Sequence, residues 1–186
     1  SDGQWLALTS ASNETRHDIW ISGAVQNATP VHWLKTEFDE ALPRFSPNGQ
    51  WLAYVSDETG RTEVYIRPFR GETHAAEGKI RVSIGGGDYP VWSRSGNELF
   101  FMTADGSIHA ASTQNLGSRQ TVTPPVKLFR PCSETGLRAN PLVHQPYMWI
   151  YDVSPDGRFL FNCMSQPAGR FVVWMNWRLA DSEVPR

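Results

Sequence analysis

The sequence predicts an all-β fold: a β-propeller of four-stranded antiparallel blades, about four of them, forming a partial or open propeller. The first observation is a turn motif ending in glycine that recurs at positions 3, 49, 96 and 157. The second is its spacing, 46 residues (3 to 49), 47 (49 to 96) and 61 (96 to 157), against a period of roughly 40–50 for propeller blades. The third is that several of the intervening strands are apolar on both faces, which is typical of stacked sheets.

The recurring turn explains how each blade begins. In Ser46-Pro47-Asn48-Gly49 the proline presets φ at the first central position, and asparagine tolerates the next. Glycine then takes the left-handed position that closes a hairpin. Each copy of the turn is therefore expected to join an inner strand to the second strand of a blade.

Runs of β-branched and aromatic residues bounded by Gly, Asp, Asn or Pro give the strands in order. Inner strands are predicted at Leu42–Phe45, Tyr89–Trp92 and Ile150–Val153. Second strands are predicted at Trp5–Thr9, Trp51–Ser56, Leu99–Thr103 and Phe159–Cys163. Third strands are predicted at Asp18–Ser22, Glu63–Pro68, Ser107–Ala111 and Phe171–Trp177. Outer strands are predicted at Val31–Lys35, Lys79–Ile84 and Val126–Phe129.

Two of these strands indicate stacked blades most clearly, because they are apolar on both faces. Trp51–Val55 and Phe171–Met175 are apolar at almost every position, so neither would leave one face of its sheet to water. A β-sandwich and a solenoid are the competing folds, and the long repeat period argues against both. The chain of 186 residues is treated as one propeller, residues 1–186, with blades at approximately 1–38, 39–86, 87–147 (including a long loop at 131–147) and 148–186.

Composition narrows the function classes. The formal net charge is -2, and no cluster of Lys and Arg marks a nucleic-acid surface. No apolar run approaches the length of a membrane-spanning helix, so membrane insertion is not expected. Two cysteines, Cys132 and Cys163, make no disulfide framework, and whether they pair stays open. No signal peptide is present, and the compartment is undetermined.

The two ends of the predicted propeller are unfinished. The first blade lacks an inner strand and the last lacks an outer strand, so the chain is expected to be part of a longer or processed product. Phe171–Trp177 would be an unpaired apolar edge, and the outward faces of the terminal blades would expose Trp5 and Ile21. We therefore expect self-association, most simply two arcs meeting end to end. The alternative is a four-bladed ring closed within one chain.

Several segments resemble the TolB-like propeller repeat. They are Ala41–Gly49 and Asp88–Gly96, which carry the turn, and Thr62–Phe69, which is similar to the third strand of that repeat. Tyr151–Leu160 and Phe171–Trp177 resemble the final blade of C-terminal propellers in bacterial multidomain proteins of the sensor and kinase type. The resemblance covers nearly the whole chain. It implies the propeller fold, a binding role and a periplasmic or extracytoplasmic location, although the chain has no kinase motif of its own.

Candidate binding residues lie on loops that lead into inner strands, because propeller ligands are usually held there. They are Asp39, Asp88, Tyr89, Arg138, His144, Tyr147 and Trp149. The structural alternative for the aspartates is a carboxylate that accepts backbone N–H groups, and for the long loop it is the covering of a sheet edge. A ring of aspartates holding a cation is the functional alternative.

The function expected from these features is a non-catalytic recognition or scaffold module that binds a protein, a peptide or an envelope ligand. No catalytic residue, metal ligand or cofactor is assigned, because the five histidines are scattered and no Gly-x-Ser-x-Gly motif occurs. The alternative is a propeller enzyme, similar to lactonases or lyases, with a metal in the central channel.

Overall fold

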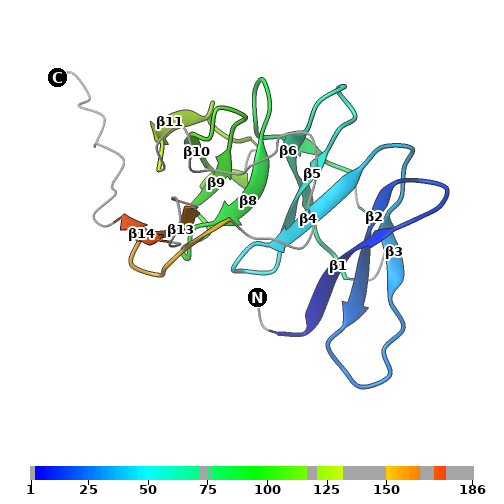
Figure 1. Ribbon diagram of the computed structural model, residues 1–186. Coiled ribbons are helices and arrows are strands. Elements are labelled where there is room, and N and C mark those ends of the chain that lie inside the picture. Colours follow the sequence, from blue (N-terminus) through cyan, green and yellow to red (C-terminus); the bar gives the residue numbers. More distant parts are fainter. Residues whose placement is uncertain are drawn as a thin grey trace.

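The computed structural model describes residues 3–71, 75, 77–116, 121–131, 150–163 and 170–174. Within these residues the strands form four antiparallel sheets that follow one another along the chain (Figure 1). The first blade contains β1 (Trp5–Ala11), β2 (His17–Gly23) and β3 (Val31–Leu34). The second contains β4 (Glu40–Phe45), β5 (Trp51–Ser56), β6 (Glu63–Pro68) and β7 (Ile80–Arg81). The third contains β8 (Asp88–Trp92), β9 (Glu98–Met102), β10 (Ile108–Ser112) and β11 (Val126–Phe129). The fourth contains β12 (Tyr151–Val153), β13 (Phe159–Cys163) and β14 (Arg170–Trp174).

The predicted fold class is confirmed. Each sheet runs in simple up-and-down order, β1-β2-β3, β4 to β7, β8 to β11 and β12-β13-β14. Figure 1 shows the sheets succeeding one another from right to left, as blades of a propeller do. Among the described residues, no helix has the length and apolar character to cross a membrane.

The repeated turn has the predicted geometry. Its glycines have positive φ: 74° at Gly3, 69° at Gly49, 74° at Gly96 and 80° at Gly157. The Ser46 hydroxyl oxygen accepts the Trp51 N–H at 3.0 Å and so joins the turn to β5. The fourth blade differs, since its Ser154 N–H bonds to the carbonyl of Arg158, four residues on rather than five.

A feature that the sequence did not predict is a bulge in two inner strands. The register shifts between Ala41 and Arg44 in β4 and between Asp88 and Val91 in β8. The bulges contain Leu42-Pro43 and Tyr89-Pro90, and proline is expected at bulges because it cannot donate to the ladder. Leu42 has φ 54° and Tyr89 has φ 52°, a left-handed conformation that is costly for bulky side chains.

The core lies between the blades rather than inside any one of them. One cluster joins the first two blades and packs Ile19, Ile21 and Trp33 against Leu52 and Tyr54. A larger cluster continues through the second, third and fourth blades. A fully buried side chain of this kind contributes about 1.5–3 kcal/mol, so the contacts between blades hold the fold together. Each contact between successive blades is called a seam below.

One expectation about the outward face of the first blade is wrong. Ile21 is fully buried, and Trp5 is only partly exposed because it packs on Phe69 of the second blade. Both residues lie on the side of the sheet that meets the second blade, while Leu6 and Leu8 of β1 point outward. At the other end, β14 is the edge strand of the described fourth sheet, and residues 175–177 lie outside the described part.

Candidate functional site

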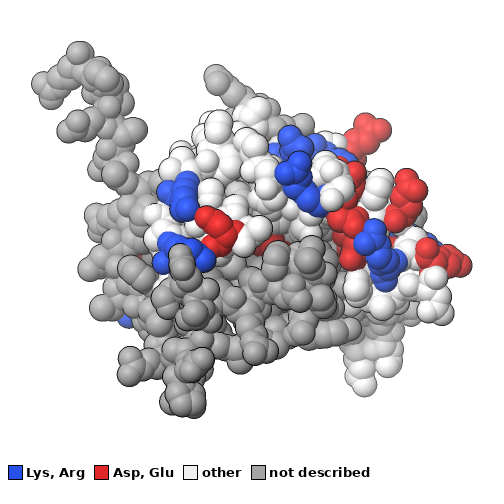
Figure 2. All heavy atoms as spheres, turned by 45° about the horizontal axis from the view of Figure 1, so that its top comes forward, with Lys and Arg blue, Asp and Glu red and all other residues white. Residues whose placement is uncertain are grey.

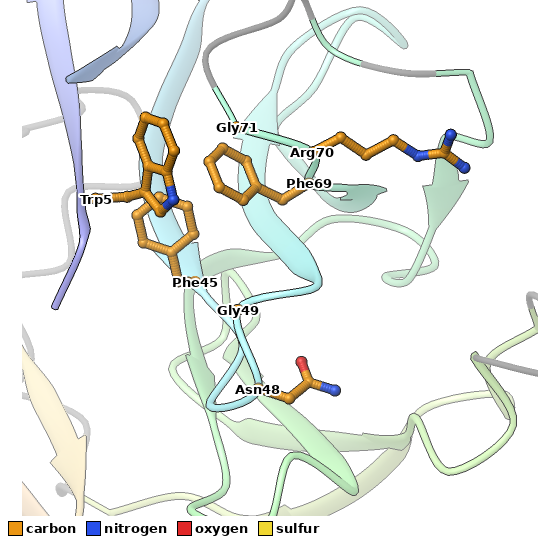
Figure 3. Close-up of a pocket in the computed structure, with 7 residues that line it drawn as sticks. All are labelled: Trp5, Phe45, Asn48, Gly49, Phe69, Arg70 and Gly71. Carbon is orange, nitrogen blue, oxygen red and sulfur yellow. The ribbon is translucent and has the colours of Figure 1, made fainter. Parts of the chain in front are cut away.

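A pocket of about 310 Å³ lies at the seam between the first two blades. Three aromatic residues from three different segments line it, Trp5, Phe45 and Phe69. Figure 3 shows the three rings gathered on one side of the site. The remaining lining comes from the turn and from the segment after β6: Asn48, Gly49, Arg70 and Gly71.

The aromatic rings are held by strand ends. Trp5 is the first residue of β1, Phe45 is the last residue of β4, and Phe69 directly follows β6. The Phe69 ring lies edge-on to both others, with centroid distances of 5.7 Å to Trp5 and 4.7 Å to Phe45. Such edge-to-face pairs are a favoured aromatic geometry. Phe69 itself is buried, whereas Trp5 and Phe45 keep part of their surface exposed.

Hydrogen bonds fix the polar side of the pocket. Asn48 Oδ1 accepts from the Ser46 hydroxyl at 2.7 Å and from the Gln50 N–H at 3.1 Å. The Phe69 N–H donates to the Gln50 carbonyl at 2.8 Å, which ties the end of β6 to the same turn. The turn is thus held against the aromatic rings.

The segment after β6 closes the site. Gly71 has φ 85°, and a Cβ there would lie 3.4 Å from Cζ2 of Trp5, so its backbone approaches the indole closely. Arg70 is exposed, and its guanidinium extends away from the rings (Figure 3). The pocket therefore combines three aromatic rings with one positive charge, one carboxamide and exposed backbone.

The chemistry available in this pocket is binding rather than bond-making. The seven lining residues include no carboxylate, imidazole, thiol or hydroxyl group that could act as a nucleophile or general base. In the described part of the chain, no group of three or more His, Cys, Asp or Glu residues is arranged to hold a metal ion.

The predicted residue Asp39 lies at the opposite end of the blade, since it precedes β4 while Phe45 ends it. Asp39 is buried, and its Oδ1 lies 2.8 Å from Nδ1 of His17. Its N–H donates to Asp57 Oδ1 at 3.0 Å, and Asp57 pairs with Arg16 at 2.7 Å. These contacts join the first two blades, so Asp39 is engaged in a seam.

Asp88 and Tyr89 begin the inner strand of the third blade. Asp88 Oδ1 accepts the N–H of Tyr89 at 2.8 Å, and Tyr89 is buried. Burial raises the pKa of the Tyr89 phenol, to which the neighbouring Asp88 charge adds. The other four candidates, Arg138, His144, Tyr147 and Trp149, lie outside the described residues, as does Cys132.

The structure shows that Glu40, which lies next to Asp39 in the candidate loop at residues 38–40, is a buried acid. Glu40 is 1% exposed and accepts a hydrogen bond from the Thr36 hydroxyl through one carboxylate oxygen. Its other oxygen has no hydrogen-bond partner among the described residues. Burial raises the pKa of Glu40 to about 7, and the nearby charges of Asp18 and Asp39 act in the same direction. The sequence shows only an acidic pair before a strand, with no sign of burial.

Charged side chains surround the end of the first two blades where Asp39 and Glu40 lie. Positive and negative groups are mixed there, so they form no continuous surface of one sign. Lys35 pairs with Glu14 at 2.9 Å and Lys79 pairs with Glu58 at 2.6 Å. On the face in Figure 2, blue and red side chains alternate toward the right. Exposed pairs of this type contribute little to stability. Among the described residues on this face, the Lys and Arg side chains are interspersed with Asp and Glu and form no continuous basic surface of the kind that nucleic acids require (Figure 2).

The pocket was missed at the level of sequence for a simple reason. Trp5, Phe45 and Phe69 are far apart in the chain. Trp5 was expected on an exposed outward face, and Phe45 and Phe69 were noted only as the ends of the segments Leu42–Phe45 and Thr62–Phe69. Each of the three residues lies at a strand end next to a turn or loop. That common position is the one sequence signal that could have indicated that they line the same pocket.

Comparison with solved structures places the fold among TolB-like and peptidase propellers. A putative TolB from Agrobacterium tumefaciens aligns with TM-score 0.51 and 19% identity, over 69% of this chain and 47% of its own. A puromycin-hydrolyzing peptidase from Mycobacterium tuberculosis aligns with TM-score 0.56 and 18% identity, over 91% of this chain and 27% of its own. The β-propeller domain of the Trilobed protease from Pyrococcus furiosus, described as having an open velcro topology, aligns with TM-score 0.50 and 15% identity, over 93% and 51%.

These similarities concern the fold alone. The chain spans about half or less of the length of each of the three matched structures, between 27% and 51%. No protein-family model and no curated protein sequence matches it. The three include a TolB and two proteins named as a peptidase or a protease, and one fold serves many activities.

Proposed function

We propose that this chain is a non-catalytic recognition module, the propeller part of a larger bacterial protein of the sensor type. Its ligand is a protein or peptide segment that inserts one apolar side chain into the pocket at the first seam. The single observation that supports this most is the grouping of Trp5, Phe45 and Phe69 around about 310 Å³ of space. The resemblance of the final blade to C-terminal sensor propellers is consistent with it.

The size of the pocket favours a side chain over a cofactor. Sites for small molecules usually enclose about 300–1,000 Å³, and this pocket lies at the lower end of that range. Insertion of an apolar group would cover the exposed parts of Trp5 and Phe45. The binding free energy would become more favourable by roughly 25 cal/mol for each Å² of apolar surface removed from water. A leucine or phenylalanine side chain has the required shape and chemistry.

Arg70 is the reason for proposing an acidic residue in the ligand, next to the apolar one. The side chain is exposed beside the pocket, and no other described residue forms an ion pair with it. A carboxylate next to the inserted side chain would therefore meet an available guanidinium, which binds carboxylates in a planar, two-pronged geometry. The preferred segment is an apolar residue flanked by an acidic one.

The test uses synthetic peptides and the indole N–H signal of Trp5 in proton–nitrogen NMR spectra. The probes are N-acetylated tripeptide amides with Leu, Phe or Ser at the centre and Glu or Lys on both sides. We expect the Glu-flanked Leu and Phe peptides to shift the Trp5 signal, and the Ser and Lys-flanked peptides to have much weaker effects.

Two matched variants locate the binding. Arg70→Gln should weaken binding of the Glu-flanked peptides severalfold. Arg94→Gln should leave binding unchanged, since Arg94 is an exposed arginine in the repeated turn of the third blade and does not line the pocket. Equal shifts from the Leu and Ser peptides would contradict the proposal. So would binding that leaves the Trp5 signal in place.

A further inference from the structure

The end of the first seam that lies away from the pocket holds three buried acids and is called the acidic end below. Asp18, Asp39 and Glu40 are 0%, 8% and 1% exposed. One carboxylate oxygen of Glu40 accepts a hydrogen bond from the Thr36 hydroxyl, and the other is buried with no hydrogen-bond partner among the described residues. An ionised carboxylate in such surroundings is costly, and the neutral acid avoids most of this cost. The position of Glu40 therefore favours its protonated form.

No cation pairs with Glu40 in the part of the chain that the structure describes. Arg16, His17 and Lys35 lie 2.7, 2.8 and 2.9 Å from carboxylate oxygens of other residues. The charge of Arg44, on the same strand as Glu40, interacts with that of Asp152. The charged or titratable groups on the elements packed around Glu40 are His17 and Asp18 of β2, His32 of β3, Arg44 of β4, Tyr54 of β5, Asp88 and Tyr89 of β8, and Arg16, Lys35, Glu37, Asp39 and Asp57 of the adjoining loops. Loss of the Glu40 proton would therefore add a negative charge near those of Asp18 and Asp39.

Two strands connect the acidic end of the seam to the pocket. β1 and β4 lie side by side across the seam (Figure 1). Trp5 is the first residue of β1 and Phe45 is the last residue of β4, so both strands reach the pocket. Between the two ends, the N–H of Leu42 on β4 donates to the hydroxyl oxygen of Thr9 on β1 at 3.2 Å. A change in the spacing of these strands at the acidic end therefore also changes the distance between the Trp5 and Phe45 rings.

We infer that a proton on Glu40 keeps the first seam closed, and that its loss loosens the seam and opens the pocket. The ionised carboxylate is repelled by Asp18 and Asp39, which are close enough to act on its charge. Separation of the strands admits water to the carboxylate and so relieves both the repulsion and the cost of burial. The pocket is therefore intact in the protonated state and distorted in the ionised state.

The direction of the pH dependence follows from burial. Burial raises the pKa of Glu40 from 4.5 to about 7 in the closed seam, and a loosened seam that admits water returns it toward 4.5. Between these values the closed seam binds the proton more tightly than the loosened one. The equilibrium constant for opening therefore grows as pH rises, by up to about tenfold per pH unit. One consequence rests on the proposed function: the Glu-flanked apolar peptide binds more tightly below the pKa of Glu40 than above it.

The test is a pH titration of the nuclear Overhauser contact between Trp5 and Phe69, whose ring centroids lie 5.7 Å apart across the first seam. No peptide is present, so the result does not depend on the proposed ligand. The cross-peak should weaken as pH is raised from below to above the Glu40 pKa of about 7. The contact between Phe100 and Phe159, 5.0 Å apart across the seam of the third and fourth blades, is the internal reference and should keep its strength.

Three variants assign the titration to Glu40. Glu40→Gln cannot ionise and should keep a strong Trp5–Phe69 contact at every pH. Glu37→Gln is the matched control, because Glu37 is an exposed glutamate in the same loop, and it should titrate like the wild type. Thr36→Val removes the hydroxyl group that favours the ionised form of Glu40, so its titration midpoint should move to higher pH. Circular dichroism checks that each variant is folded, and Thr36→Val decides the matter if Glu40→Gln is not, since a purely structural role of Glu40 would not move the midpoint.

A Trp5–Phe69 contact that stays constant with pH would overturn the inference. So would a pH dependence that survives in Glu40→Gln, which would assign it to another group such as His17, or a parallel weakening of the Phe100–Phe159 contact. The Glu-flanked leucine peptide should bind the wild type severalfold more weakly above the pKa of Glu40 than below it, and should bind Glu40→Gln equally at both. A peptide that binds at neither pH contradicts the proposed function, whereas the Trp5–Phe69 contact still decides the inference.

Discussion

The hydroxyl group of Tyr151, in the fourth blade, donates a hydrogen bond of 2.8 Å to the backbone carbonyl of Tyr89, in the bulge of the third. Tyr89 is held there with φ 52°. The second blade has a comparable arrangement, in which the N–H of Leu42, φ 54°, donates to the hydroxyl oxygen of Thr9 at 3.2 Å. In both cases a neighbouring blade holds a strained inner-strand residue in place, so the bulges and the seams depend on each other.

Tyr151→Phe should lower the free energy of unfolding by about 1–3 kcal/mol, because it leaves the buried carbonyl of Tyr89 without this donor. Urea denaturation followed by tryptophan fluorescence measures the change. A variant as stable as the wild type would show that the hydrogen bond does not hold the bulge.

Gly49→Val should destabilise the chain by about 1–3 kcal/mol through the backbone alone. Gly49 has φ 69°, and a Cβ there would meet no heavy atom within 4 Å, so no steric contact contributes. Gly49→Asn is the matched control, since asparagine tolerates this conformation, and it should cost much less. Equal thermal melting of the two variants would contradict this interpretation of the turn.

Trp51→Ala should lower the free energy of unfolding by about 3–5 kcal/mol, as expected for the loss of a large buried aromatic side chain. Trp51 is 7% exposed and belongs to the core cluster that joins the second blade to the third. Ile84→Ala, at an exposed position, should change the stability by less than about 0.5 kcal/mol. Chemical denaturation of both variants checks the contrast.

Glu40 should make the stability depend on pH. Its pKa is raised from 4.5 to about 7 in the folded chain, so the folded state binds the proton more tightly than the unfolded state between these values. The free energy of unfolding should therefore fall as pH rises through this window, by about 1–3 kcal/mol for this group.

Glu40→Gln should flatten that dependence, because the amide keeps the side-chain shape and cannot ionise. Glu77→Gln, at an exposed position, is the control and should leave the pH profile as it is in the wild type. Urea denaturation at a series of pH values measures both. A Glu40→Gln profile that still falls in parallel with the wild type would locate the titration elsewhere.

The strands could be predicted from the sequence because the turn repeats and the strand composition point to the same positions. Four strands have the bounds that were predicted, and the other described strands differ by a few residues at their ends. The four are Trp51–Ser56, Glu63–Pro68, Val126–Phe129 and Phe159–Cys163. The bulges could not be predicted, because Pro43 and Pro90 are also compatible with a strand that begins after them.

The side-chain environments were harder to predict for a different reason. Which face of the first blade meets the second depends on the packing between blades, which the sequence does not encode locally, so Ile21 of β2 was assigned to the wrong surface. The pocket likewise exists only once Trp5, Phe45 and Phe69 meet across a seam. Asp39 was correctly placed before an inner strand, but its partner His17 comes from another blade.

The stacking of blades through their aromatic faces is tested most directly by nuclear Overhauser contacts between rings. The Tyr54–Tyr65 contact within one blade, at 5.8 Å between centroids, serves as the internal reference. Cross-peaks of comparable strength should join Trp5 to Phe69, at 5.7 Å, and Phe100 to Phe159, at 5.0 Å, across two different seams. A spectrum with the reference contact but neither of the others would contradict the stacked-blade arrangement.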